Sequence, residues 1–117
     1  MKIEVLLSDI QKRPKMFVRE INIEYICYFL FGYCCANREL SEDDIDRKFC
    51  AWFGSWLIMW IEDNVDKDYN PKTAWWFEDI RWLTKSGQDE VAVFFELCKK
   101  FFEDYNNKVG YFSWRNK

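Results

Sequence analysis

The sequence has 117 residues, the usual length of one domain, and this leaves no room for a second hydrophobic core. Half of the residues are hydrophobic and 21% are aromatic, which excludes a disordered chain and predicts an aromatic core, an exposed recognition surface or both. The formal net charge is −3 and the longest apolar run has 13 residues (49–61), so we expect neither nucleic-acid binding nor a membrane span, which takes about 20 residues.

The first helix is expected from Ile3 to Lys12, because apolar residues recur there at helical spacing. It should stop before Pro14, which disfavours helical geometry in the preceding residue. Residues 13–21 are then expected to form an extended link.

A second helix is expected after Asn22, whose side chain can cap the free amide groups of the first turn. It should run to about Arg38, with one apolar stripe toward the core. Further apolar side chains, Phe31 among them, lie on its other faces. We therefore expect the rest of the chain to cover this helix on several sides.

A third helix is expected from Ser41 to about Asp63, since a hydroxyl cap followed by carboxylates suits a helix start. Apolar residues on every side place it in the middle of the bundle. Gly54 costs about 1 kcal/mol relative to alanine in a helix interior, which indicates close approach of another backbone or a bend. The main stripe of this helix consists of Phe49, Trp52, Phe53, Trp56, Leu57 and Trp60.

Residues 62–72 are the expected long loop, and a fourth helix should begin near Thr73. Ser86 should cap a fifth helix together with Asp89, and residues 111–114 should fold back over the core. The predicted fold is therefore all-α: a single-domain bundle of about five helices with a short extended C-terminal tail. The fifth helix has the clearest stripe, formed by Val91, Phe94, Phe95, Cys98, Phe101, Phe102 and Tyr105.

Histidine is absent, which removes the Ser-His-Asp and Cys-His nucleophile pairs and every imidazole metal site. The glycines lie too far apart for a phosphate-binding loop, so we expect no cofactor and no metal. An odd number of cysteines without a signal peptide predicts reduced, buried thiols in a cytoplasmic protein. The five are Cys27, Cys34, Cys35, Cys50 and Cys98.

The charges are distributed unevenly along the chain. Residues 1–40 carry a net charge of +1, residues 41–79 carry −6 and residues 80–117 carry +2. The acidic middle third is either a solvated surface that keeps an aromatic-rich protein in solution or a surface that steers toward a basic partner. Clustered lysine and arginine, which phosphate binding requires, are missing from it.

Three local features resemble small bacterial immunity proteins of the contact-dependent growth inhibition and polymorphic toxin type. A short first helix is followed by Arg-Pro-x-Met-Phe, the second helix contains Phe-Gly-Tyr, and a late region reads Asp-Glu-x-Ala-x-Phe-Phe-Glu-Leu. Lys15 stands where the family often has glycine, so the turn there is expected to differ. The matching positions are Arg13, Pro14, Met16, Phe17, Phe31, Gly32, Tyr33, Asp89, Glu90, Ala92, Phe94, Phe95, Glu96, Leu97 and Phe101.

This resemblance implies a cytosolic protein that binds one cognate toxin domain, frequently a nuclease, and blocks its active site. It carries over no functional residue, because its motifs are structural. A nuclease cleft is lined with basic residues, so an acidic helical face could mimic the polyanion and occlude the cleft. The expected partner-binding residues are first Glu42, Asp43, Asp44 and Asp46, and then Glu62, Asp63, Asp66 and Asp68.

Two alternatives remain open at this point. One is a helical interaction domain with another partner, such as a homodimer formed through an exposed part of the Trp52, Trp56 and Trp60 stripe. The other is an enzyme, which would need a carboxylate or thiol mechanism without histidine. Our prediction is that the chain is not an enzyme.

Overall fold

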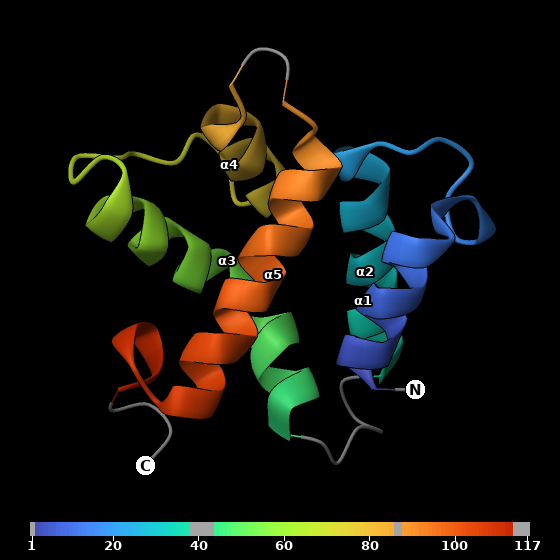
Figure 1. The fold of residues 1–117 in the computed structure, drawn as a ribbon, viewed down its shortest axis with the longest axis horizontal. Helices are drawn as coiled ribbons and strands as arrows, with labels where there is room; N and C mark the ends of the chain where they lie inside the picture. Colours follow the sequence, from blue (N-terminus) through green and yellow to red (C-terminus); the bar gives the residue numbers. More distant parts are fainter. Residues whose placement is uncertain (1, 38–43, 86–87, 114–117) are drawn as a thin grey trace.

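The computed structural model describes residues 2–37, 44–85 and 88–113 (Figure 1). This part of the chain contains no β-strand, and the predicted all-α fold with five helices is confirmed. The helices are α1 (Ile3–Lys12), α2 (Ile23–Asn37), α3 (Asp44–Asn64), α4 (Trp76–Leu83) and α5 (Glu90–Asn107), with 3₁₀ helices η1 (Pro14–Met16) and η2 (Gly110–Phe112). None of the described helices combines the length and hydrophobicity that a bilayer crossing requires.

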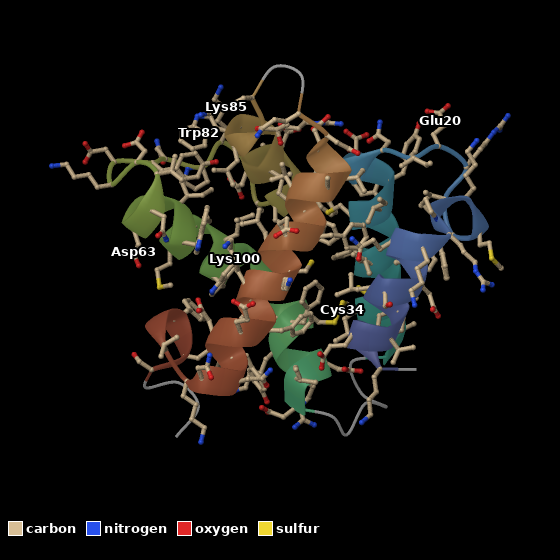
Figure 2. All side chains as sticks on the ribbon, viewed as in Figure 1. Glu20, Cys34, Asp63, Trp82, Lys85 and Lys100 are labelled. Carbon is tan, nitrogen blue, oxygen red and sulfur yellow. A yellow bond between two sulfur atoms is a disulfide. The ribbon has the colours of Figure 1, made fainter. Side chains whose placement is uncertain are left out.

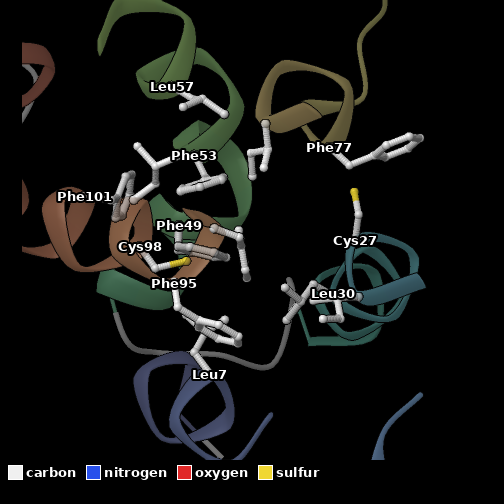
Figure 3. Packing of buried hydrophobic residues seen from close by; sticks show 14 of the residues in the cluster. Leu7, Cys27, Leu30, Phe49, Phe53, Leu57, Phe77, Phe95, Cys98 and Phe101 are labelled. Atoms are coloured by element: carbon white, nitrogen blue, oxygen red, sulfur yellow. The ribbon is translucent and has the colours of Figure 1, made fainter. Parts of the chain in front are cut away.

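Helix α3 lies in the middle of the bundle, as predicted, and contacts each of the other four α-helices. Its side chains supply the centre of an aromatic core (Figure 3). The ring of Phe53 is 1% exposed and meets Phe94 and Phe101 of α5 edge-on, each at 5.7 Å between centroids. Edge-to-face geometry brings the positive ring edge to the negative ring face, so these contacts add to the gain from burial. Much of the aromatic excess is therefore core.

The tryptophan stripe of α3 is largely internal. Trp56 has no exposed surface, and its indole Nε1–H donates a 2.9 Å hydrogen bond to Oδ2 of Asp104 on α5. Trp52 is half-buried beneath Tyr111 and Phe112, and Trp60 stacks on Trp56. A dimer contact on this stripe would have to use the partly exposed Trp52 and Trp60, and it stays a prediction.

The N-terminus of α1 is capped by a carboxylate from α3. The backbone N–H of Ile3 donates a 3.0 Å hydrogen bond to Oδ1 of Asp46, and both residues are buried. The first amide groups of a helix have no partner within the helix, and a negative charge there is favoured by the helix dipole. This contact therefore fixes α1 against α3.

Two of the predicted helix starts need correction. Helix α4 begins at Trp76 instead of Thr73, because the hydroxyl of Thr73 accepts the N–H of Trp75 in a turn. Helix α5 is capped by Asp89, which accepts the N–H of Val91 at 3.0 Å, while the predicted cap Ser86 lies outside the described residues.

The predicted cap of α2 is confirmed, because Oδ1 of Asn22 accepts the N–H of Glu24 at 2.8 Å. The link before α2 is not wholly extended, since residues 14–16 form η1. Proline fixes φ and needs no hydrogen bond from its nitrogen, so it suits the first position of such a turn. The cap expected at Ser41 lies outside the described residues.

The chain turns sharply after α5 and folds back onto the core. Lys108 adopts a left-handed conformation with φ of 56°, which ends the helix as predicted. The expected extended tail forms η2 over part of its length, and residues 114–117 lie outside the described part. Phe112 of η2 has no exposed surface and lies 5.1 Å from Phe101 between ring centroids. The tail therefore contributes to the core.

Candidate partner-binding surface

The predicted acidic residues lie at opposite ends of α3. Asp44 opens the helix and Glu62 lies in its last turn, about 27 Å away at the 1.5 Å rise of an α-helix. Glu42 and Asp43 lie outside the described residues. The acidic third of the sequence therefore does not form one continuous face.

The described carboxylates at the start of α3 serve contacts within the chain. Asp46 is 5% exposed and caps α1. Asp44 accepts a 2.5 Å hydrogen bond from the hydroxyl of Tyr105 and lies 3.7 Å from Arg47. These contacts suit the positive end of the helix and account for both residues structurally.

The carboxylates at the other end of α3 are exposed. We call Glu62, Asp63, Asp66 and Asp68 the acidic end. Within the described part of the chain, Glu62, Asp63 and Asp68 form no ion pair, and no basic residue lies in the last turn of α3. Carboxylates at the negative end of a helix dipole cost stability, each about 0.3–1 kcal/mol. The placement of Glu62 and Asp63, the two of these residues that lie within α3, is therefore unfavourable for the helix itself.

The loop that carries the acidic end is held in a defined shape. Oδ1 of Asp66 accepts the N–H of Asp68 at 3.0 Å, and the N–H of Tyr69 donates to the carbonyl oxygen of Asp66 at 3.0 Å. The N–H of Asp66 in turn donates to the carbonyl oxygen of Ile61, at the end of α3. A partner would meet these carboxylates already positioned, which lowers the entropy cost of binding.

A recess of about 350 Å³ adjoins the acidic end. Asp66 lines it together with Tyr69 and Trp82, whose rings lie 4.4 Å apart between centroids. Trp82 is 44% exposed on α4, on the same side of the molecule as Asp63 (Figure 2). An exposed tryptophan can become buried against a partner and supply binding energy. The carboxylates beside it can attract a basic partner. This pairing could not be predicted from the sequence, because Trp82 and Asp66 come together only through the fold.

The carboxyl group of Asp79 holds the loop to α4. It is 2% exposed and accepts a short hydrogen bond from the hydroxyl of Tyr69. Burial raises the pKa of Asp79, the hydrogen bond from Tyr69 opposes that rise, and the charge of Glu78 adds to it. A raised pKa is common in active sites. Here the carboxyl group of Asp79 is hydrogen-bonded to Tyr69 of the same chain, and this bond fixes the shape of the loop. We interpret Asp79 as a structural residue that sequence reasoning missed.

Arg81 of α4 joins three acidic residues from different segments. Its Nε lies 3.1 Å from Oε2 of Glu90 on α5, and its Nη1 lies 3.3 Å from Oε1 of Glu24 on α2. Glu78 of α4 lies 3.7 Å from the same nitrogen. Arg81 lines the recess and its charge is thus already compensated, whereas Lys72 is a second basic residue in the lining. The four carboxylates of the acidic end outnumber the two lysines of this region, Lys67 and Lys72.

The cysteines differ from the expectation of five reduced, buried thiols. Cys34 of α2 and Cys50 of α3 form a disulfide, with Cα atoms 5.6 Å apart. Cys35 is exposed, while Cys27 and Cys98 are buried and free. Burial raises the pKa of Cys27 to about 12, so this thiol carries almost no thiolate at neutral pH. Neither the described cysteines nor the carboxylates form a group of three that could hold a metal ion.

Comparison of the chain with protein-family models, with curated proteins and with solved structures finds no match. The resemblance to immunity proteins therefore remains a prediction that rests on short sequence motifs. The geometry of the surface supplies the remaining argument about function.

Proposed function

We propose that this chain is an immunity protein that binds a basic region of a cognate bacterial toxin domain through the acidic end of α3. The observation that carries the proposal is the cluster of exposed carboxylates on a fixed loop beside the recess of Tyr69 and Trp82. Two of these charges, Glu62 and Asp63, are unfavourable at the end of their own helix, so their benefit is expected from an external partner. A nuclease domain fits this chemistry, since its substrate is a polyanion and its cleft must be basic.

The proposal narrows the binding surface expected from the sequence. Glu62, Asp63, Asp66 and Asp68 attract the partner at long range, and Trp82 then anchors it at short range. Asp44 and Asp46 are left out, because their carboxylates are occupied within the chain.

Charge reversal of the acidic end tests this surface. Glu62→Lys, Asp63→Lys, Asp66→Lys and Asp68→Lys are combined in one variant. The matched control reverses four exposed carboxylates elsewhere, namely Glu4, Glu20, Glu96 and Glu103. Both variants change the net charge equally, so a difference between them reports position and not total charge.

The partner for the test is sought in the neighbouring reading frame, where the proposal predicts a large secreted protein with a variable C-terminal toxin domain immediately upstream. Co-expression with that domain should rescue growth for wild type and for the control variant, and the acidic-end variant should fail to rescue. Rescue by the acidic-end variant at wild-type level would exclude this surface. Failure of the wild-type protein to rescue would reject the immunity function itself.

We further propose that the chain neutralises by occlusion and performs no catalysis. The absence of histidine and the raised pKa values of the two buried free thiols, Cys27 and Cys98, support this view. The cytoplasm is the proposed compartment, because a delivered toxin acts there.

The disulfide between Cys34 and Cys50 weighs against the cytoplasm, where thiols are kept reduced. Rapid alkylation of thiols during cell lysis, followed by mass measurement, decides between the compartments. Alkylation of all five cysteines would show that Cys34 and Cys50 are reduced in the cell and would support a cytoplasmic location. Alkylation of only three, with Cys34 and Cys50 unmodified, would contradict that location.

A further inference from the structure

Basic side chains gather around the end of α1 and the link that follows it. We call residues 12–19 the basic link. Its four basic side chains are exposed, and within the described part of the chain none of them forms an ion pair. Asp9 and Glu20 flank it, so residues 9–20 carry a net charge of +2, against −5 for the rest of the chain. The four are Lys12, Arg13, Lys15 and Arg19.

The backbone of the basic link has a defined shape. The N–H of Val18 donates a 3.0 Å hydrogen bond to the carbonyl oxygen of Pro14, and the side chain of Val18 is buried. The ring of Phe17 meets that of Phe29 on α2 edge-on, at 5.5 Å between centroids. The link is thus held against α2, and a partner would meet its charges already positioned, which lowers the entropy cost of binding.

Met16 of the basic link is directed to solvent. It is 71% exposed, the highest value among the exposed large hydrophobic residues of the described chain. A single exposed apolar residue is ordinary on a protein surface. Met16, however, lies between Lys15 and a shallow recess of about 380 Å³ that begins at the next residue. Apolar side chains and unpaired cations therefore share one small surface. The recess is lined by Phe17, Val18, Arg19, Glu20, Tyr25 and Phe29.

The basic link and the acidic end lie at opposite ends of the longest axis of the molecule (Figure 1). Glu20, beside the link, and Asp63, in the acidic end, mark these two sides in Figure 2. The longest dimension is 39 Å, several times the Debye length of about 8 Å at physiological ionic strength. A negative surface in contact with the link is therefore screened from the carboxylates of the acidic end. The separation of charge also turns the link toward such a surface.

We propose that the basic link binds the surface of a bilayer rich in anionic phospholipid, with Met16 inserted among the headgroups and the basic side chains on phosphate groups. Each lysine or arginine near such a surface strengthens binding about fivefold. The flexible, unbranched side chain of methionine adds to this without a matching pocket. Such binding is peripheral and needs no membrane-spanning helix.

The small size of this surface favours a bilayer over a protein partner. A standard protein interface takes about 20–30 residues from each side and has an apolar centre. The basic link has eight residues, and its other apolar side chains, Phe17 and Val18, are partly or wholly buried in the fold. A lipid surface requires neither a large area nor a complementary shape. Nucleic acid is disfavoured, because contacts to phosphate do not account for an apolar side chain among the charges.

Co-sedimentation of the full chain with phospholipid vesicles tests the charges. The chain should bind vesicles of equal parts phosphatidylglycerol and phosphatidylcholine at least about tenfold more tightly than pure phosphatidylcholine, and added salt should release it. Replacement of all four basic residues of the link by glutamine should weaken binding by at least about a hundredfold, since four fivefold losses multiply. The matched control has the same net charge and should bind like wild type. It replaces four exposed lysines elsewhere by glutamine, namely Lys67, Lys85, Lys99 and Lys100.

The insertion of Met16 is tested separately. Met16→Ser should weaken binding by about tenfold and leave thermal stability unchanged, because the side chain has few contacts within the fold. Val65→Ser, at a residue near the acidic end that is 53% exposed, is the control and should bind like wild type. In a Cys35→Ser background, a polarity-sensitive dye on Met16→Cys should shift its emission to the blue on vesicles, whereas a dye on Val65→Cys should not.

Three results would overturn the proposal: equal binding to vesicles with and without phosphatidylglycerol, equal binding of the two glutamine variants, or a dye on Met16→Cys that does not respond. Tighter binding of a single-stranded oligonucleotide than of vesicles assigns the link to nucleic acid and also overturns it. A mass above one chain that falls to one chain in the glutamine variant of the link assigns this surface to a second copy, with the same consequence. The vesicle experiment needs no toxin, so its failure leaves the proposed immunity function intact, and failed rescue leaves the vesicle result intact.

Discussion

The hydroxyl of Tyr69 donates a hydrogen bond to the carboxyl group of Asp79, ten residues further along the chain. Tyr69 belongs to the loop that carries Asp66 and Asp68, and Asp79 is buried in α4. This contact therefore ties the acidic end to the helix that carries Trp82. Its loss should affect both the stability of the fold and the geometry of the proposed binding surface.

Tyr69→Phe removes the donor and leaves a buried carboxyl group without its partner. We expect a loss of about 1.5–3 kcal/mol in the free energy of unfolding, the usual range for a hydrogen bond to a charged group. The measurement is urea unfolding followed by tryptophan fluorescence. Combination with Asp79→Ala, which removes the acceptor, gives a double-mutant cycle, and a coupling energy near zero would contradict a direct Tyr69–Asp79 interaction.

Asp79→Asn should alter the dependence of stability on pH. The pKa of Asp79 is raised above 3.8 in the folded protein, so the folded state holds this proton to higher pH than the unfolded chain. The stabilisation from this group is complete below the unfolded pKa and is lost as pH rises through the folded pKa. The asparagine side chain does not titrate, so the variant does not lose stability through this group as pH rises. Its side-chain oxygen can still accept the hydrogen bond from Tyr69. Its stability relative to wild type should thus rise with pH across that interval, and a flat difference in unfolding experiments would refute the raised pKa.

Reaction with a thiol reagent should distinguish three classes of cysteine. In the folded protein only Cys35 should react quickly, because Cys27 and Cys98 are buried. Denaturation without a reductant should expose three thiols, and denaturation with a reductant should expose five. Five thiols before reduction would mean that Cys34 and Cys50 are not bonded.

Reduction of the disulfide should lower stability. The bond closes a loop with a sequence separation of 16 residues, for which the chain-entropy model gives about 3 kcal/mol. Urea unfolding with and without a reductant measures the difference. A Cys35→Ser variant, which keeps the disulfide, is the control and should respond to the reductant as wild type does.

Phe112→Ala tests whether the C-terminal 3₁₀ helix belongs to the core. Phe112 has no exposed surface and contacts the rings of Phe101, Tyr105 and Trp52. Truncation of such a phenylalanine costs about 3–5 kcal/mol. Val109→Ala nearby, at a position that is 46% exposed, should change stability by less than about 0.5 kcal/mol. Equal effects of the two variants would show that η2 does not pack as described.

Trp82→Ala and added salt should act on different steps of toxin binding. Loss of the anchor should mainly raise the dissociation rate, with a cost of about 2 kcal/mol or more if Trp82 lies in the centre of the interface. Added salt should mainly slow association, because it screens the acidic end. Surface plasmon resonance at several salt concentrations separates the two rates, and a salt-independent association rate would argue against electrostatic attraction.

The helices could be predicted from the sequence because each depends on local spacing and capping. The bounds of α1 and the cap at Asn22 needed only the apolar period and the chemistry of an amide side chain. Asp46 shows the limit of that reasoning. In the sequence it is one of several carboxylates that open a helix, and only the packing of α1 against α3 brings it to the N–H of Ile3.

The disulfide and the exposure of α2 could not be predicted for a similar reason. Cys34 and Cys50 lie on different helices, so their distance depends on how α2 and α3 pack. The lack of charge between residues 25 and 37 was visible in the sequence, and it suits a helix that the rest of the chain covers on several sides. That expectation is wrong for the side of α2 that carries Phe31, which is 57% exposed in the fold.

The two ends of α3 have opposite electrostatic character. At its start the carboxylates of Asp44 and Asp46 complement the helix dipole, whereas at its end Glu62 and Asp63 oppose it. The final turn should therefore be less stable than it would be with neutral side chains, and its amide hydrogens should exchange faster in the wild type than in a Glu62→Gln, Asp63→Asn variant. A positively charged ligand at that end would relieve the repulsion and slow the exchange. Recognition would then tighten the very turn that makes the contact, so that affinity and local order rise together.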